Sequence, residues 1–179
     1  MALYFVRHGQ TDWNKEKRLM GVADIEMNEA GRAEAGQTRD TLRPLGFAAI
    51  ISSPLKRAIQ TAEIIAEAHP DTPVVVAEEL RERDFGDYEG RVNDGNYFGL
   101  WDYDNNDPQG GETPQELCAR IFPFIDKVSN DYKGDVLLVA HGGVGLAVEA
   151  YFRGIPEDGN LLRYVTGHGE VKKYEARQL

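Results

Sequence analysis

The sequence predicts a single α/β domain with a mostly parallel central sheet and helices on both faces. Short runs of almost uniformly apolar residues alternate along the chain with longer amphipathic stretches. Uniformly apolar runs are typical of strands covered on both faces, as in parallel sheets, and their alternation with helices is typical of α/β folds. The length of 179 residues suits one domain, which we expect to span residues 1–179.

Four of the apolar runs are predicted strands, at residues 2–6, 48–52, 74–77 and 136–140. The amphipathic stretches between and after them predict helices at about 29–43, 54–68, 114–131 and 144–152. The C-terminal stretch LLRYVTGHGEVKKYEA alternates around a glycine-containing turn, which predicts a hairpin-like pair or edge strands.

Two of the predicted helices carry start signals. Ser53-Pro54 offers a capping side chain followed by a proline at the first helical position. Thr113 begins the second signal, in which Glu116 stands three residues after the cap and completes a capping box. We therefore expect these two helices to begin directly after Ser53 and Thr113.

The composition narrows the classes of partner. Twenty Lys and Arg residues oppose thirty Asp and Glu residues, a formal net charge of −10. Such a surface argues against nucleic acid and anionic membranes as partners, so an anion site has to be a local basic pocket.

No signal-peptide pattern opens the chain and no apolar run approaches the roughly 20 residues of a membrane span, so we expect a cytoplasmic protein. Cys118 is the single cysteine, which excludes an intrachain disulfide, and we expect it to be buried in a helix.

Residues 91–111 do not fit the alternation of strands and helices. A loop of this length in a compact domain is usually functional or disordered, and its aromatic side chains argue against disorder. We therefore predict a lid. The aromatic residues are Tyr97, Phe98, Trp101 and Tyr103. The acidic residues are Asp94, Asp102, Asp104 and Asp107, and Arg91 is the only basic one.

Basic residues and glycines follow three of the predicted strands at the point where each strand ends. Open α/β sheets bind ligands at the carboxyl ends of their strands, and planar guanidinium groups suit phosphate oxygens. Glycines let the backbone approach such a ligand closely. The sequence therefore predicts a site for a dianion. Its residues are Arg7, His8 and Gly9 after the first strand, Arg57 in the helix after the second, and His141, Gly142 and Gly143 after the strand at 136–140.

A family resemblance extends these observations. The stretch RHGQTDWN is followed by MGVADIEMNEAGRAEA, SSPLKRAIQTAEII, LRERDFGDYEG, GGETPQEL and LLVAHGG. In this order, and over nearly the whole chain, they resemble the motifs of the histidine phosphatase superfamily, also called the phosphoglycerate mutase-like family. The resemblance implies that His8 is a nucleophile that becomes a phosphohistidine and that Glu82 is the proton donor. It also implies that Arg7, Arg57 and His141 surround the phosphoryl group, that Thr11 and Asn14 contact it further, and that Gly21 lines the substrate site.

The proton donor is the least certain of these residues from chemistry alone. Glu82 belongs to a run of carboxylates that otherwise indicates a solvated acidic loop, and Asp84 is the alternative donor. Neither a metal nor a cofactor is implied. His8, His141 and Glu82 could imitate a ligand set, but two neighbouring arginines would repel a divalent cation.

We expect a phosphomonoesterase that hydrolyses small phosphorylated metabolites. The alternatives are a cofactor-dependent phosphoglycerate mutase and a catalytically inactive family member that serves as a binding module. The acidic lid should disfavour a substrate carboxylate, which argues against the mutase, and the complete set of motif residues argues against an inactive protein. Tyr97 and Trp101 are predicted either to contact the alcohol portion of the substrate or to pack the lid onto the domain. The natural substrate and the oligomeric state stay open.

Overall fold

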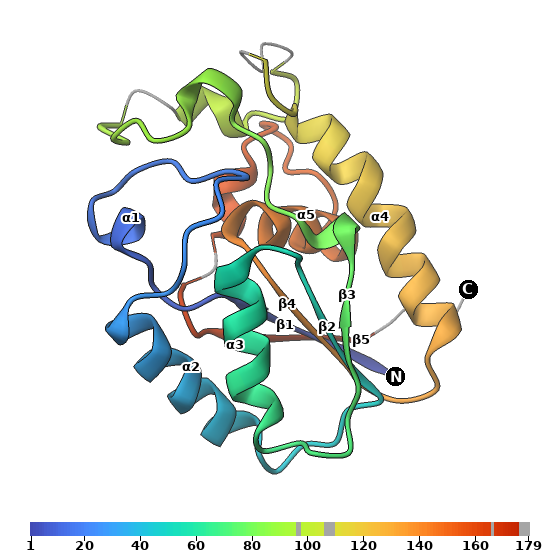
Figure 1. Cartoon of the computed structure of the whole chain (residues 1–179). Coiled ribbons are helices and arrows are strands. Elements are labelled where there is room, and N and C mark those ends of the chain that lie inside the picture. The colour runs from blue at the N-terminus through green and yellow to red at the C-terminus, as the bar shows by residue number, and fades with distance from the viewer. Residues whose placement is uncertain (96–97, 106–109, 166, 176–179) are drawn as a thin grey trace.

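A five-stranded sheet forms the centre of the molecule (Figure 1). The computed structural model describes residues 1–95, 98–105, 110–165 and 167–175. The strands are β1 (Ala2–Arg7), β2 (Ala49–Ser52), β3 (Val74–Val76), β4 (Val136–Ala140) and β5 (Val171–Glu175). Their order is β3-β2-β4-β1-β5, and every neighbouring pair is parallel except the antiparallel pair β1 and β5. The prediction of a mostly parallel sheet is confirmed.

Helices cover both faces of the sheet (Figure 1). They are α2 (Glu29–Leu42) and α3 (Lys56–Ala66) on one face, and α4 (Pro114–Asp131) and α5 (Gly142–Arg153) on the other. In β1, Leu3 and Phe5 belong to the core with α4 and α5, whereas Tyr4 and Val6 belong to the core with α2 and α3. Because both faces are buried, every side chain of the strand except the last is apolar.

The strand β3 differs from the prediction. Its side chains were expected to be covered on both faces, but Val74, Val75 and Val76 are 43%, 40% and 53% exposed. The reason is its place in the sheet, since β3 is the outermost strand and pairs with β2 alone. An apolar run therefore predicted the strand correctly and its burial wrongly.

The two helix-start predictions have different outcomes. Thr113 caps α4 with the expected capping box, in which its hydroxyl accepts from the N–H of Glu116 and the Glu116 carboxylate accepts from the N–H of Thr113. The helix α3 instead begins at Lys56, with Leu55 as the cap residue. The Ser53 hydroxyl lies 2.6 Å from Nε2 of His141. Ser53 thus contacts a strand-end histidine, and the prediction placed the start of this helix two residues too early.

The C-terminal region is a single edge strand rather than a hairpin. Residues Leu161–Tyr164 form a short 3₁₀ helix, η4, and β5 is the only part of this region, among the described residues, that joins the sheet. The predicted alternative of edge strands is therefore met in part.

Cys118 is buried in α4 as expected, and burial raises the pKa of its thiol to about 12. Among the described residues, no helix combines the length and apolarity that crossing a bilayer requires.

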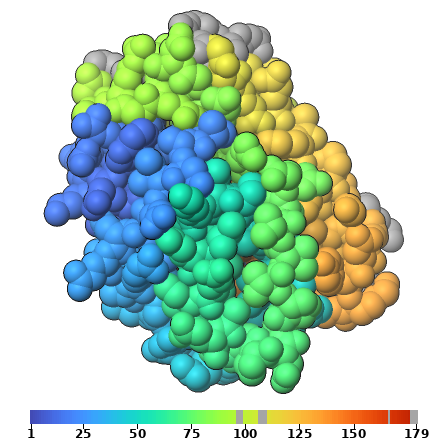
Figure 2. All heavy atoms as spheres, in the orientation of Figure 1, coloured from blue at the N-terminus to red at the C-terminus, as the bar shows by residue number. Residues whose placement is uncertain are grey.

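Two loops close over the carboxyl end of the sheet. The segment after β1 contains α1 (Asp12–Lys15), and the segment after β3 contains η1 (Glu78–Leu80), η2 (Gly86–Tyr88) and η3 (Phe98–Trp101). Backbone hydrogen bonds join the two loops, from Leu19 N–H to Arg91 O at 2.9 Å and from Asn93 N–H to Lys17 O at 2.7 Å. Figure 2 shows this contact at the surface, where the yellow-green segment after β3 meets the blue segment after β1.

Candidate functional site

His8 lies directly after β1 and is almost completely buried, with 2% of its surface exposed. Its Nδ1 is 2.7 Å from the carbonyl oxygen of Gly9. Because a carbonyl only accepts, Nδ1 carries the ring proton and Nε2 keeps its lone pair. Nε of Arg57 donates to this Nε2 at 3.2 Å. The ring is therefore held in one tautomer, with its unprotonated nitrogen directed at a guanidinium group.

Arg57 is fully buried near the start of α3. Its Nη1 donates to the carbonyl of Ala23 at 2.7 Å and its Nη2 to the carbonyl of Gly21 at 2.8 Å. Burial lowers the pKa of Arg57 to about 10, so the group is still a cation at neutral pH. Gly21 has a φ of 52°, a left-handed conformation that glycine adopts without strain. The loop after β1 thus fixes the orientation of a charge that belongs to α3.

His141 lies beside His8, with 5.1 Å between the ring centroids. Burial, followed by the charge of Arg57, lowers the pKa of both histidines well below the ordinary value of 6.5. The ring of His141 is therefore neutral at pH 7. A bound dianion would favour the charged form and raise this pKa.

Arg7 and Gly142 form the opposite side of the site. A Cβ atom on Gly142 would lie 3.4 Å from Cζ of Arg7, so the glycine lets the guanidinium group lie close to the first turn of α5. Burial lowers the pKa of Arg7, and the nearby Glu82 carboxylate opposes this effect. The two arginines come from β1 and α3, and parallel pairing brings their elements to one edge of the sheet.

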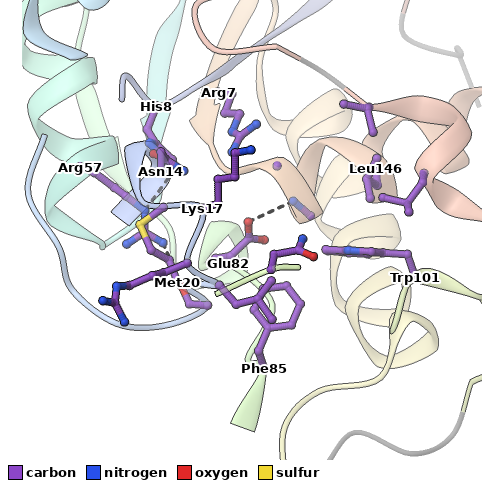
Figure 3. A pocket seen from close by; sticks show the side chains of 18 residues that line it. Arg7, His8, Asn14, Lys17, Met20, Arg57, Glu82, Phe85, Trp101 and Leu146 are labelled. Carbon is purple, nitrogen blue, oxygen red and sulfur yellow. Dashed lines mark hydrogen bonds between the residues drawn. The ribbon is translucent and has the colours of Figure 1, made fainter. Parts of the chain in front are cut away.

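Glu82 reaches the same site from the segment after β3 (Figure 3). Its Oε2 accepts from the N–H of Gly143 at 3.0 Å, and its Oε1 accepts from the N–H of Arg83 at 2.9 Å. The residue is 9% exposed. Asp84 is oriented differently, because its Oδ1 accepts from the N–H of Gly86 at 2.7 Å and it does not line the pocket.

A pocket of about 360 Å³ opens from these groups (Figure 3). Nine of the residues predicted from the sequence line it: Arg7, His8, Asn14, Gly21, Arg57, Glu82, Trp101, Gly142 and Gly143. Its apolar walls include Leu19, Phe85, Trp101, Leu146, Leu162 and Val165. The described lining residues contain one carboxylate, that of Glu82, because Asp102 and Asp104 do not reach the pocket. The described part of the predicted lid therefore contributes an aromatic wall and no acidic one.

Among the described residues of the predicted site, Thr11, Gly9 and His141 do not line the pocket. Thr11 is fully buried, its hydroxyl donates to Oδ1 of Asn14 at 3.0 Å, and it caps α1 by accepting from the N–H of Asn14 at 3.1 Å. Its observed contact is therefore with a lining residue. Tyr97 lies outside the described residues, as does Asp107.

The sequence did not point to Arg83, which anchors the described part of the lid. The residue is 2% exposed, and its guanidinium group lies 5.0 Å from the ring centroid of Trp101 and 5.3 Å from that of Phe85. Its Nε donates to the carbonyl of Glu112 at 2.6 Å, and its Nη1 donates to the carbonyl of Leu100. An arginine inside an acidic stretch was the available signal, but nothing local indicated burial.

His168 was also missed. Its Nδ1 lies 3.0 Å from the carbonyl oxygen of His8, and the two ring centroids are 5.7 Å apart. The contact connects the loop before β5 to the backbone of the strand-end histidine. Because the two residues are 160 positions apart in the chain, no spacing or motif predicts it.

No group of three or more His, Cys, Asp or Glu side chains within residues 1–95, 98–105, 110–165 and 167–175 is arranged to hold a metal ion. The polar end of the pocket instead combines the guanidinium groups of Arg7 and Arg57, the imidazole of His8 and the carboxylate of Glu82, with the buried imidazole of His141 beside that of His8. Guanidinium groups beside a buried imidazole suit a phosphate dianion.

Known proteins resemble this chain over most of its length. The family model of the histidine phosphatase superfamily (branch 1) matches residues 3–175. An uncharacterized phosphatase, PhoE, of Bacillus subtilis (strain 168) is 38% identical over 142 residues, which cover 79% of this chain and 72% of that protein. A 2,3-bisphosphoglycerate-dependent phosphoglycerate mutase of Cytophaga hutchinsonii is 32% identical over 188 residues, with 98% of this chain and 88% of that protein covered.

A solved structure also resembles this chain over most of its length. Mycobacterial glucosyl-3-phosphoglycerate phosphatase in complex with VO3 superimposes with a TM-score of 0.85 at 30% sequence identity, covering 96% of this chain and 91% of that one. The fold agrees with that of this structure, and the family model covers nearly the whole chain. This chain therefore belongs to branch 1 of the histidine phosphatase superfamily.

Proposed function

We propose that this protein is a metal-independent phosphomonoesterase that hydrolyses small phosphorylated metabolites through a phosphohistidine on His8. The observation that carries the proposal is the orientation of the His8 ring. Nδ1 is occupied by the Gly9 carbonyl at 2.7 Å, and the lone pair of Nε2 faces the Arg57 guanidinium at 3.2 Å. A neutral imidazole held in this way is prepared to attack a phosphorus atom that Arg57 helps to bind.

The reaction has two steps. In the first, Nε2 of His8 attacks in line, the P–N bond forms, and the bond between phosphorus and the alcohol oxygen breaks. Glu82 gives its proton to the departing oxygen. In the second, the Glu82 carboxylate takes a proton from water, the resulting hydroxide attacks phosphorus, and the P–N bond breaks to release phosphate. Acid–base help of this kind is typically worth about 10² to 10⁴ in rate.

The remaining groups stabilise the transferred phosphoryl group. Arg7 and Arg57 neutralise charge on its equatorial oxygens, and His141 becomes a hydrogen-bond donor when the dianion raises its pKa. Asn14 adds a polar contact, supported by the buried hydroxyl of Thr11. The mycobacterial phosphatase of the same fold was solved in complex with VO3, which resembles a phosphoryl group in charge and shape, and this supports a phosphoryl site in the present chain.

Glu82 is the better candidate for the proton donor. Its carboxylate lines the pocket with His8, whereas Asp84 is bonded to the backbone outside it. Trp101 is our candidate for packing against the alcohol portion of the substrate, because it forms part of the apolar wall. The same proposal includes a cytoplasmic location and a small phosphorylated substrate as partner, with no nucleic acid or membrane partner.

A phosphoglycerate mutase is the alternative activity. The mutase relative favours it, since the resemblance covers 98% of this chain. A mutase would return the phosphoryl group from His8 to a second hydroxyl instead of to water. Turnover of 3-phosphoglycerate to 2-phosphoglycerate that depends on 2,3-bisphosphoglycerate would favour the mutase over the phosphatase. An inactive binding module is disfavoured, because the described site retains a nucleophile, two arginines and a carboxylate.

Rapid quenching tests the proposal. After mixing with a ³²P-labelled phosphomonoester, the protein should carry label that survives base and is lost in acid, as expected of a phosphohistidine. His8→Ala should acquire none. His168→Gln, which removes the neighbouring imidazole 5.7 Å away, should still be labelled. Acid-stable label, or label that persists in His8→Ala, would show that another group is the nucleophile.

A further inference from the structure

A remote histidine contacts the backbone of the proposed nucleophile. Nδ1 of His168 lies 3.0 Å from the carbonyl oxygen of His8, and the two rings meet at 66° with 5.7 Å between their centroids. Because a carbonyl only accepts, Nδ1 of His168 is the donor in this hydrogen bond. His168 does not line the pocket. Its observed contact is therefore with the backbone of the site and not with the cavity that receives the substrate.

The peptide group between His8 and Gly9 is held at both ends. Its carbonyl accepts from His168, and its N–H donates to the hydroxyl of Thr61 at 3.1 Å. Thr61 is 1% exposed in α3, and its hydroxyl donates in turn to the carbonyl of Arg57 at 2.8 Å. Two segments that are remote in the chain thus fix the orientation of one peptide group.

The orientation of this peptide group controls the ring of the nucleophile. The ring of His8 is joined to the Gly9 carbonyl through the covalent chain and also through the hydrogen bond from Nδ1 at 2.7 Å. Rotation of the peptide group between them changes the distance and angle of that hydrogen bond, which keeps the ring proton on Nδ1. A proton on Nε2 would remove the lone pair that the proposed attack on phosphorus requires. A residue that fixes the peptide group therefore fixes the reactive tautomer.

The turn that presents His168 is itself anchored. The N–H of Gly167 donates to Oε2 of Glu170 at 2.9 Å, across the turn. The hydroxyl of Thr38 in α2 lies 3.4 Å from the carbonyl oxygen of Gly169. The strand β5 begins directly after this turn and pairs with β1, the strand that ends beside His8. The imidazole is thus held by contacts to α2 and to the sheet.

His168 acts as a neutral donor. Burial, followed by the charge of Arg7, lowers the pKa of His168 from its ordinary value of 6.5, and the carboxylate of Glu34 acts in the opposite direction. The ring is therefore uncharged at pH 7 and adds no third positive charge beside the two arginines of the site. Its contribution to the site is the hydrogen bond.

We propose that His168 is a positioning residue for phosphoryl transfer, because its Nδ1–H holds the His8–Gly9 peptide group and thereby the reactive tautomer of His8. The inference rests on the proposed phosphatase function, since it concerns the reactivity of that nucleophile. It assigns His168 no contact with the substrate and no proton transfer. Removing the donor should therefore slow the attack on phosphorus and leave the binding of phosphate unchanged.

The ring nitrogens of the wild type test the geometry without turnover. In long-range ¹H–¹⁵N correlation spectra, the protonated and unprotonated nitrogens of a neutral imidazole resonate at well-separated shifts. At pH 7, both His8 and His168 should carry the proton on Nδ1. A neutral His168 with its proton on Nε2 could not donate to the His8 carbonyl, and this result would overturn the inference.

Three variants separate the hydrogen bond from the packing of the ring. His168→Phe keeps a planar ring without the donor, and the single-turnover rate of His8 labelling at saturating substrate should fall about tenfold, on the order of the loss of one hydrogen bond. His168→Asn places an amide N–H near the former Nδ1 and should recover most of this rate. His69→Phe is the control, because His69 is 6% exposed, packs against Phe47 and does not line the pocket. It should keep the wild-type rate.

Binding and spectra complete the test. The dissociation constant of orthophosphate, measured by calorimetry, should be the same in the wild type and His168→Phe, whereas the His8 ring in this variant should show a mixture of tautomers. A wild-type labelling rate in His168→Phe, or equal slowing in His168→Phe and His168→Asn, would contradict the role of the donor. So would a loss of phosphate affinity as large as the loss of rate. If His168→Phe does not fold, the wild-type ring spectra decide the question.

The proposed function fails separately from this inference. A protein that hydrolyses no phosphomonoester and acquires no label would overturn the phosphatase. The ring spectra of the wild type and of His168→Asn would still decide whether His168 holds the His8–Gly9 peptide group, because they require no substrate.

Discussion

Gly143 separates the proposed proton donor from the aromatic wall, and replacing it with alanine should affect both. A Cβ atom at this position would lie 2.5 Å from Oε1 of Glu82 and 2.6 Å from Cη2 of Trp101. Ordinary contact begins at 3.4 Å, so the carboxylate has to retreat by roughly 0.9 Å. The N–H of Gly143 also donates to Oε2 of Glu82 at 3.0 Å, and this hydrogen bond would be distorted.

Gly143→Ala should lower the catalytic activity strongly and the stability of the fold only moderately. A misplacement of about 1 Å at a reacting group can cost on the order of 10² in rate. We therefore expect kcat/KM for an alkyl phosphate to fall about 100-fold in Gly143→Ala. Overpacking costs about 1 to 3 kcal/mol, and replacing a helical glycine by alanine returns about 1 kcal/mol. The free energy of unfolding should consequently decrease by no more than about 2 kcal/mol.

The assay compares kcat/KM with urea-induced unfolding in two variants. Gly36→Ala is the control, because Gly36 lies within α2 and nothing is within 4 Å of the added Cβ. It should gain up to about 1 kcal/mol in stability and keep wild-type activity. Wild-type turnover of alkyl phosphates by Gly143→Ala would refute the placement of Glu82 as proton donor. If Gly143→Ala lost activity only in proportion to the fraction of protein that is unfolded, the argument that the added methyl group displaces Glu82 would be refuted.

Three further predictions concern the chemistry of the site. Glu82→Gln should slow hydrolysis of an alkyl phosphate by about 10² to 10⁴. Hydrolysis of p-nitrophenyl phosphate should slow far less, since nitrophenolate leaves without a proton. Equal slowing of both substrates would assign the role of general acid to another residue, with Asp84 the next candidate. Activity should persist in EDTA and be inhibited by vanadate, and loss in EDTA that a divalent ion restores would contradict metal independence. Because folding lowers the pKa values of His8 and His141, the unfolded chain takes up protons below about pH 6.5 that the folded protein does not. The free energy of unfolding should therefore fall from pH 7 to pH 5, by up to about 2.7 kcal/mol per pH unit for the two groups. In urea titrations at several pH values, a double variant with asparagine at both positions should show a smaller dependence of the free energy of unfolding on pH.

Much of the fold and the centre of the site followed from local patterns. Uniform apolar runs predicted the strands, and amphipathic stretches predicted the helices within a few residues of their observed ends. The convergence of His8, Arg57 and His141 followed from topology, because parallel neighbours end at one edge of a sheet. Thr113 and Glu116 specified the start of α4, since a capping box involves only residues within one turn.

Local patterns failed where a residue's partner is distant in the chain. Ser53 has the sequence context of a helix cap, but its hydroxyl lies beside His141, 88 positions later. The valines of β3 have the composition of a buried strand, yet their exposure depends on the place of β3 at the edge of the sheet. A charged side chain such as Arg83 is expected at the surface, and only the rings of Phe85 and Trp101 and distant carbonyls make its burial possible.

The sequence by itself determined the α/β class, the family and the residues His8, Arg7, Arg57, His141 and Glu82 as candidates for phosphoryl chemistry. Periodicity, caps and motif spacing act over a few residues, so they can be read along the chain. Only the tertiary structure decided which way these side chains point and what surrounds them. It set the tautomer of His8 and placed His168 against its carbonyl, 160 positions away. It also brought the Glu82 carboxylate to the N–H of Gly143, 61 positions later, because contacts between remote segments depend on how the whole chain packs.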